Sequence, residues 1–177
     1  MAFGKPDSKG RSSGILPGRL GRIARPPAGE PFVCLTRELM RSAAWSGCSI
    51  YARHLMDFLI IDHMQHAGRE NGRLKATYDQ LAERGIPRKL VSSAVQELVE
   101  LGLLERTSKG GRNMPSLYRL TFLHTADAKP TDEWRRISAE MASGTAEVMK
   151  AMRRRARGKS QPRHEAVRLR VVRGGLR

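Results

Sequence analysis

The sequence has few of the residues that define several common protein classes. Only two of its 177 residues are cysteine, which excludes a disulfide scaffold and a cysteine-rich zinc fold. Aromatic residues make up 5% of the chain, so stacking on unpaired bases is not the expected mode of recognition. No apolar run approaches the roughly 18 residues of a membrane span, and the N-terminus lacks the apolar core of a signal peptide. These absences favour a protein of the reducing cytoplasm.

Acidic residues are scarce relative to basic ones, and the basic surplus is unevenly placed. Lys and Arg total 33 against 17 Asp and Glu, a net charge of +16, which calls for a polyanionic partner: nucleic acid first, an anionic membrane second. Residues 1–31 carry +4 and residues 150–177 carry +10, whereas residues 32–149 carry only +2. We therefore predict a basic disordered arm over residues 1–31, a folded region over 32–125 and a basic tail over 158–177.

Two helices are expected at the start of the folded region. The first spans residues 36–44, with Thr36 as its N-cap. The second spans residues 49–66, where Ser49 can cap the start and Gly68 follows the end. Apolar residues of the second helix cover more than one stripe. This pattern indicates either the central helix of the core or part of a dimer interface.

A short strand and a short helix are expected next. After the turn signal Asn71-Gly72, residues 74–76 can form the strand. Thr77 and Gln80 then have the spacing of a capping box, which predicts a helix over residues 78–83.

A longer helix and a hairpin complete this region. The helix follows Pro87 and spans residues 88–101. Its apolar positions form a single stripe: Val91, Ala94, Val95, Leu98 and Leu101. Two further runs, 103–107 and 116–123, flank a glycine-rich basic loop, and the second run alternates with a period of two. They predict a β-hairpin.

The order helix, helix, strand, helix, helix, hairpin is that of a winged helix-turn-helix domain. Residues 77–86 (TYDQLAERGI) and 95–104 (VQELVELGLL) resemble bacterial winged helix-turn-helix proteins. They look most like the small DNA-binding domains of plasmid, phage and mobile-element replication or regulatory proteins. The resemblance covers roughly residues 32–123 and implies a mainly α fold with a small β-hairpin wing, a C-terminal helix and basic flexible arms. One departure is Pro87, where many relatives place a Ser or Thr cap on the recognition helix.

The resemblance implies that the helix over residues 88–101 is a recognition helix that lies in the DNA major groove. The face opposite its apolar stripe offers side chains that can bond base edges or phosphates: Arg88, Lys89, Ser92, Ser93 and Gln96. The alternative interpretation of this face is an ordinary solvated helix surface.

Further candidate contacts lie around this helix. In the wing they are Lys109, Arg112 and Asn113. Beside the first helix of the pair, candidate phosphate contacts are Lys75, Thr77 and Tyr78. Tyr78 fits a partly buried core position equally well. The candidates in the C-terminal basic arm are Arg153, Arg154, Arg155, Arg157 and Lys159.

A last helix is expected over residues 131–157, with Thr131 as its N-cap. Its apolar residues resemble an interrupted heptad seam: Trp134, Ile137, Met141, Val148 and Met152. The seam either packs on its own domain or pairs with a second chain. In the latter case the protein binds a palindromic site as a homodimer.

No enzymatic or cofactor site stands out in the sequence. His63 and His66 share a helix face without a third ligand and are expected at the surface, and Cys34 and Cys48 are expected as small core residues. The tripeptide Gly158-Lys159-Ser160 resembles the end of a phosphate loop but lacks the preceding glycine and strand. We expect no catalytic activity, no cofactor and no metal.

The function expected from these features is sequence-specific binding of double-stranded DNA, in transcriptional regulation or replication control of a mobile element. One alternative is a replication initiator or accessory factor, and another is a non-specific architectural or RNA-associated protein. The expected partner is double-stranded DNA. A second copy of the chain and the replication or transcription machinery are further candidates, and no membrane is expected. The expected location is the cytoplasm, in association with the nucleoid.

Overall fold

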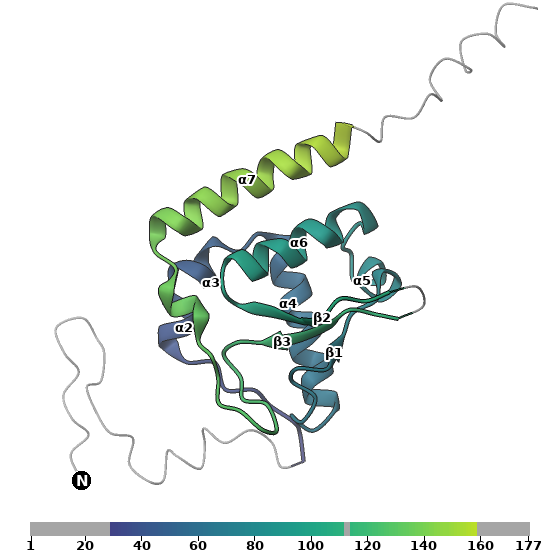
Figure 1. The fold of residues 1–177 in the computed structure, drawn as a ribbon, viewed down its shortest axis with the longest axis vertical. Helices are drawn as coiled ribbons and strands as arrows, with labels where there is room; N and C mark the ends of the chain where they lie inside the picture. Colours follow the sequence, from purple (N-terminus) through teal and green to yellow (C-terminus); the bar gives the residue numbers. More distant parts are fainter. Residues whose placement is uncertain (1–28, 112–113, 159–177) are drawn as a thin grey trace, which may run out of the picture. The chain divides into compact units, whose positions relative to one another are not determined.

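The computed structural model describes residues 29–111 and 114–158 and divides the chain into two units, Met1–Phe32 and Val33–Arg177. The predicted N-terminal arm up to residue 28 and the tail from residue 159 lie outside the described residues. Within the second unit the fold is mixed α/β, mostly helical, with one small antiparallel sheet (Figure 1).

The elements follow one another in the order expected from the sequence up to the hairpin. They are α2 (Arg37–Arg41), α3 (Ala43–Gly47), α4 (Ile50–Gln65), β1 (Leu74–Lys75), α5 (Tyr78–Glu83), α6 (Arg88–Glu100), β2 (Leu104–Ser108), β3 (Leu117–Leu120), the 3₁₀ helix η1 (Glu133–Arg136) and α7 (Ala139–Gly158).

The helix predicted over residues 36–44 is two short helices that meet at Ser42. Thr36 caps α2 as predicted, because its hydroxyl accepts a hydrogen bond from the Leu39 amide. The backbone of Ser42 is extended, and its hydroxyl accepts from the Trp45 amide at 3.1 Å and so starts a second helix. Serine favours such caps over helix interiors because its side chain competes for nearby backbone groups.

Helix α4 is the central helix of the core. Ser49 caps it as predicted, and its buried side chains include Leu55, Met56 and Leu59. These residues pack in one cluster with apolar residues of α6 and the sheet. The core alternative for this helix is therefore confirmed.

The sheet has three strands in the order β1-β3-β2, so the predicted hairpin gains β1 as a third strand. Tyr118 and Leu120 of β3 point into the core, opposite Leu74 and Leu104 on the neighbouring strands. β3 ends at Leu120, three residues before the predicted end.

Asn71 explains why β3 stops there. Its buried amide donates to the carbonyls of Leu120, Leu123 and His124 at 2.9–3.2 Å, and its oxygen accepts from the Leu120 amide at 2.7 Å. These carbonyls, and the Leu120 amide, therefore bond to a side chain instead of a neighbouring strand.

The predicted helix over residues 131–157 begins later than expected. Residues 133–136 form η1, and α7 starts only at Ala139. Thr131 is not a cap, because its amide and that of Asp132 donate to the Thr121 carbonyl at 3.0 and 3.1 Å. These bonds hold the chain against the end of the sheet, so the helix begins later in the sequence.

Gly102 lets η1 approach the end of α6. Its φ is +64°, and a Cβ atom built there would lie 2.8 Å from the carbonyl carbon of Glu133 and 2.9 Å from the Trp134 nitrogen. Trp134 is buried at this contact. A glycine is required here both by the left-handed backbone and by the close backbone of η1.

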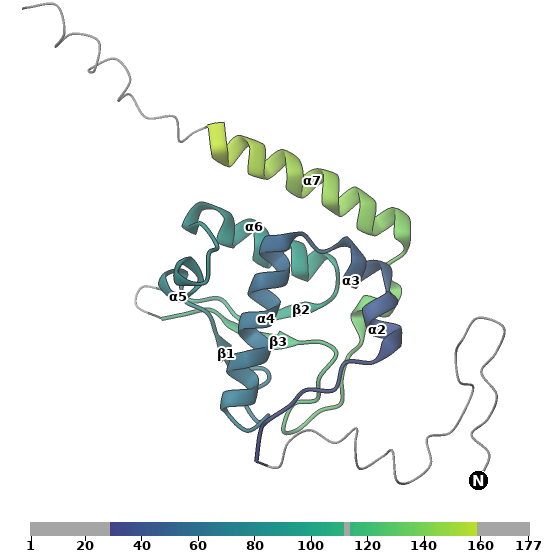
Figure 2. The same ribbon diagram turned by 180° about the vertical axis from the view of Figure 1, so that it is seen from behind.

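Helix α7 lies along α6 on the side away from the sheet, in both views (Figures 1 and 2). The end of α7 lies toward the start of α6, so the two helices run in opposite directions (Figure 2). Within α7, the predicted seam does not pack on its own domain. Ala142 and Met149 are buried, whereas the predicted Met141, Val148 and Met152 are exposed.

Candidate nucleic-acid interface

The turn between α5 and α6 is built as the sequence predicts. Thr77 and Gln80 form a capping box at the start of α5. Gly85 has a φ of +84° and ends that helix, and the buried Ile86 anchors the turn to the core. Pro87 is the N-cap of α6 and makes no side-chain cap bond, and the Leu90 amide donates to the Pro87 carbonyl at 2.7 Å. The N-terminal end of a helix favours an anion.

The polar face predicted for α6 is present in the structure. Arg88, Lys89, Ser92 and Gln96 are all exposed and lie within about one third of the helix circumference. Ser93 is half-buried, and its hydroxyl donates to the Leu90 carbonyl at 2.8 Å. Four of the five predicted recognition residues therefore share one solvent-facing surface, and Ser93 lies at its border.

Arg88 forms an ion pair with Asp79 of α5. Both side chains are more than 60% exposed, so water screens the pair and it holds the arginine only weakly. A carboxylate at this place opposes the approach of a phosphate and limits Arg88 to partners that compete with Asp79 for its donors.

The hairpin tip carries the wing candidates. It closes at Gly111 and Met114, whose backbones exchange two hydrogen bonds of 3.1 Å. A Cβ at Gly110 would lie 2.4 Å from the Met114 carbonyl oxygen, so only glycine fits there. Lys109 is exposed beside it, and Met114 is 72% exposed. The predicted Arg112 and Asn113 lie outside the described residues.

The candidate phosphate contacts lie next to this tip. Lys75, Thr77 and Tyr78 are exposed, and Tyr78 is therefore not a core residue. Lys75 of β1 and Ser108 of β2 both pair with Leu117 of β3, so β1 and β2 finish at the same end of the sheet. Thr77 and Tyr78 follow the first of these strands, and Lys109 follows the second.

The basic residues of α7 divide into two groups. Arg154 and Arg155 are exposed. Arg153, predicted as an arm residue, is instead only 18% exposed and forms an ion pair with Glu97 of α6. Arg157 lies in α7, and Lys159 lies outside the described residues. Arg153 therefore supports the fold and is removed from the set of candidate contacts.

Glu97 is a structural residue that the sequence analysis missed. It is 1% exposed, and its two oxygens accept from the amide and the hydroxyl of Ser49, each at 2.7 Å. The guanidinium of Arg153 also donates to the Ser49 hydroxyl, at 2.8 Å. One carboxylate in the last turn of α6 thus joins the start of α4 to the second half of α7. The sequence does contain a signal for this role, since the carboxylate lies next to Leu98 on the apolar side of a helix.

Two other sequence expectations are wrong. His63 is 4% exposed, because it lies on the core side of α4, and burial lowers its pKa. Cys34 is exposed, and it precedes the first helix. Cys48 is half-buried, and desolvation raises the pKa of its thiol to about 12, so the thiol stays protonated at neutral pH.

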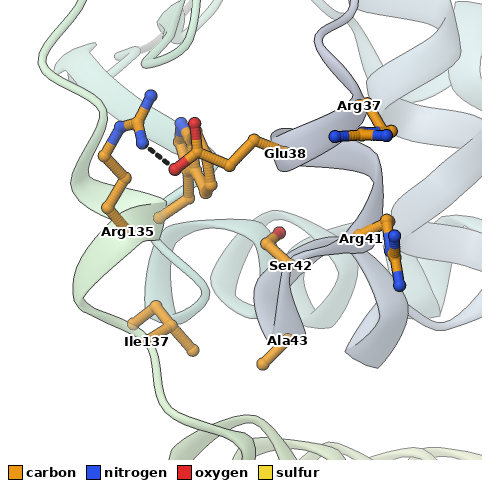
Figure 3. A pocket seen from close by; sticks show the side chains of 8 residues that line it. Arg37, Glu38, Arg41, Ser42, Ala43, Arg135 and Ile137 are labelled. Carbon is orange, nitrogen blue, oxygen red and sulfur yellow. Dashed lines mark hydrogen bonds and ion pairs between the residues drawn. The ribbon is translucent and has the colours of Figure 1, made fainter. Parts of the chain in front are cut away.

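A polar cavity of about 490 Å³ lies between α2, α3 and η1 (Figure 3). Arg135 reaches across it and forms an ion pair with Glu38. Arg37 and Arg41 also line it, but they lie on the far side from Arg135 (Figure 3). The guanidinium groups do not converge on one point, and we assign no ligand to this cavity.

Within residues 29–111 and 114–158, no three side chains of His, Cys, Asp or Glu are grouped so that they could hold a metal ion. In the same part of the chain, no helix has the length and apolarity to cross a membrane. Comparisons with protein-family models, curated proteins and solved structures found no match to this chain.

Proposed function

We propose that this protein binds double-stranded DNA in a sequence-specific manner, with α6 as the recognition helix of a winged helix-turn-helix domain. The observation that carries the proposal is the polar surface of α6, where Arg88, Lys89, Ser92 and Gln96 are exposed together. The element order and the hairpin beside α5 agree with that domain type.

The side chains on this surface suit base recognition. Arginine and lysine bond the O6 and N7 atoms of guanine, and glutamine bonds N6 and N7 of adenine through two hydrogen bonds. Arg88 lies on the first turn of α6 and Gln96 on its third, so the two read different base pairs along the groove.

Phosphate contacts supply affinity and fix the register of the domain on DNA. We assign them to Lys75, Thr77 and Lys109 around the start of α5 and the hairpin tip. Residues 32–149 carry only +2 of the +16 net charge, so most of the electrostatic attraction comes from the two ends of the chain. The biological role that we propose is transcriptional regulation or replication control of a mobile element.

A second candidate is non-specific binding of nucleic acid by the basic ends alone. It is favoured by the Arg88–Asp79 ion pair, which occupies the principal guanine-reading side chain. In this case α6 is a scaffold element and the protein is an architectural or RNA-associated factor.

Selection of bound fragments from a random duplex pool at two salt concentrations separates the two candidates. The wild type is compared with Arg88→Ala/Gln96→Ala and with the control Arg41→Ala/Gln65→Ala, which removes the same residue types from exposed positions on α2 and α4. We expect one motif for the wild type and the control, and its loss in the α6 variant. Binding without a motif, equal in all three proteins and abolished by salt, contradicts the proposal and supports the second candidate.

A further inference from the structure

Helix α7 carries a stripe of exposed apolar side chains that no described part of the chain covers. Met141 is 53% exposed, Val148 is 52% exposed and Met152 is 37% exposed. Together with the half-buried Thr145 they follow a spacing of four, three and four residues. This spacing places all four on one line along the helix, as in the seam of a helix pair.

The orientation of this stripe is fixed by the contacts that α7 makes with the domain. Ala142 and Met149 are buried against the domain, and a Cβ at Gly47 of α3 would lie 3.1 Å from the Ala142 Cβ. Arg153 holds the far end of α7 through Glu97. These three residues lie about a quarter turn from the stripe. The helix therefore cannot bury the stripe without releasing its own anchors.

The border of the stripe on the solvent side is made of small residues. Gly144 and Ala151 are exposed there, and no atom lies within 4 Å of a Cβ built at Gly144. Small residues beside a seam let a second helix approach closely. The surface therefore fits a helix better than it fits an extended chain or a duplex backbone.

The charges along α7 indicate which helix can pack on the stripe. The exposed acidic residues, Glu140 and Glu147, lie in its first half, and the exposed Lys150, Arg154 and Arg155 lie in its second half. A copy of α7 in the opposite direction places the acidic half of each helix beside the basic half of the other. A two-fold axis across the helix produces this arrangement, because it makes equivalent helices antiparallel.

We propose that two copies of this protein associate through the stripe Met141–Thr145–Val148–Met152 of α7, with the two helices antiparallel. Met141 of one protomer then packs near Met152 of the other, and Glu140 lies near the partner's basic half. The interface needs no nucleic acid, so its existence is independent of the proposed function. Only its consequence, binding to an inverted repeat, rests on that function.

Sedimentation equilibrium of the full chain in the absence of nucleic acid tests the interface. We expect the wild type to dimerise, and Val148→Glu/Met152→Glu to weaken dimerisation at least about tenfold, because two apolar contacts are replaced by charges. Met40→Glu is the matched control, since Met40 is a 50% exposed methionine on α2, and it leaves dimerisation unchanged. Circular dichroism confirms that each variant is folded.

Cysteine cross-linking tests the antiparallel orientation. In a Cys34→Ser background, Met141→Cys and Met152→Cys are oxidised separately and as a mixture. We expect a cross-linked dimer in the mixture and little in either protein alone. Cross-linking of each variant with itself indicates parallel helices and overturns the orientation. A wild type that stays monomeric at all concentrations overturns the interface, while its DNA binding, measured by fragment selection, is unaffected.

Discussion

Helices α6 and α7 lie against each other, but they are held in the fold by different kinds of contact. Helix α6 buries Val91, Val95 and Leu98 in the apolar core, and α4 and the sheet also contact it. Helix α7 is longer, yet the side chains that it buries are Ala142 and Met149. Its other anchor is the ion pair between Arg153 and Glu97.

The difference shows that an amphipathic pattern predicts packing only for a helix that the core surrounds. Helix α6 has neighbours on several sides, so its apolar stripe can pack only against the core. Helix α7 is an outer layer with a choice of faces, and small residues and a salt bridge decide which face packs. We therefore expect α7 to open locally at a lower free energy than α6.

The largest expected effect is the loss of a core side chain on α6. Leu98→Ala removes a fully buried leucine and should lower the free energy of unfolding by about 3 kcal/mol, within the range for such cavities. Urea denaturation should show one transition that moves to lower concentration for the whole domain. A loss below about 1 kcal/mol would contradict the burial of the apolar side of α6 in the core.

The second largest expected effect is the loss of the contact between α6 and α7. Glu97→Ala leaves Arg153 without its carboxylate and removes the acceptor of the Ser49 amide, and we expect a loss of about 2–3 kcal/mol. Glu100→Ala, on the exposed side of the same helix, is the control and should cost less than about 0.5 kcal/mol. In a double-mutant cycle, Arg153→Met should cost less in the Glu97→Ala background than in the wild type.

Truncation of the α7 anchor should have a smaller and local effect. Met149→Ala should cost about 1–2 kcal/mol, because α7 is an outer helix that buries few side chains and can open locally. Hydrogen exchange should show faster exchange of the α7 amides and little change in α4 and α6. Equal acceleration throughout the domain would show that α7 is as integral to the fold as α6.

The smallest expected effect is a pH dependence of the free energy of unfolding, which arises from His63 in the last turn of α4. Burial lowers the pKa of His63 below 6.5, as does the nearby His124, against a smaller opposite effect of Asp62. The unfolded chain therefore binds a proton that the folded chain resists, and stability falls as the pH drops below about 6.5. The slope is at most about 1.4 kcal/mol per pH unit. His63→Gln should flatten the stability between pH 7 and 5, measured by urea denaturation, whereas His66→Gln should not.

The parts of the fold that the sequence predicts well depend on neighbours in the chain. Thr77 and Gln80 are three residues apart, and Ser49 caps an amide three residues later, so both caps can be read locally. The spacing of Val91, Val95 and Leu98 likewise shows which side of α6 is apolar. The same pattern places Arg88, Ser92 and Gln96 on the adjoining side, where the structure has them exposed.

The errors arise where distant parts of the chain meet. Thr131 fails as a cap because its amide bonds to Thr121. Arg153 is not part of a free arm because Glu97 lies opposite to it on another helix. Neither partner can be identified from sequence spacing, since 56 residues separate Arg153 from Glu97.

The sequence alone therefore determined the helix pair, its caps, the hairpin and the concentration of charge at the two ends, because these follow from periodicity, local hydrogen bonds and composition. Only the tertiary structure decided which face of α7 is buried, that Glu97 joins three helices, and that Met141, Val148 and Met152 face the solvent. Those outcomes depend on which surfaces remain uncovered after the core has formed, and no local pattern contains that information.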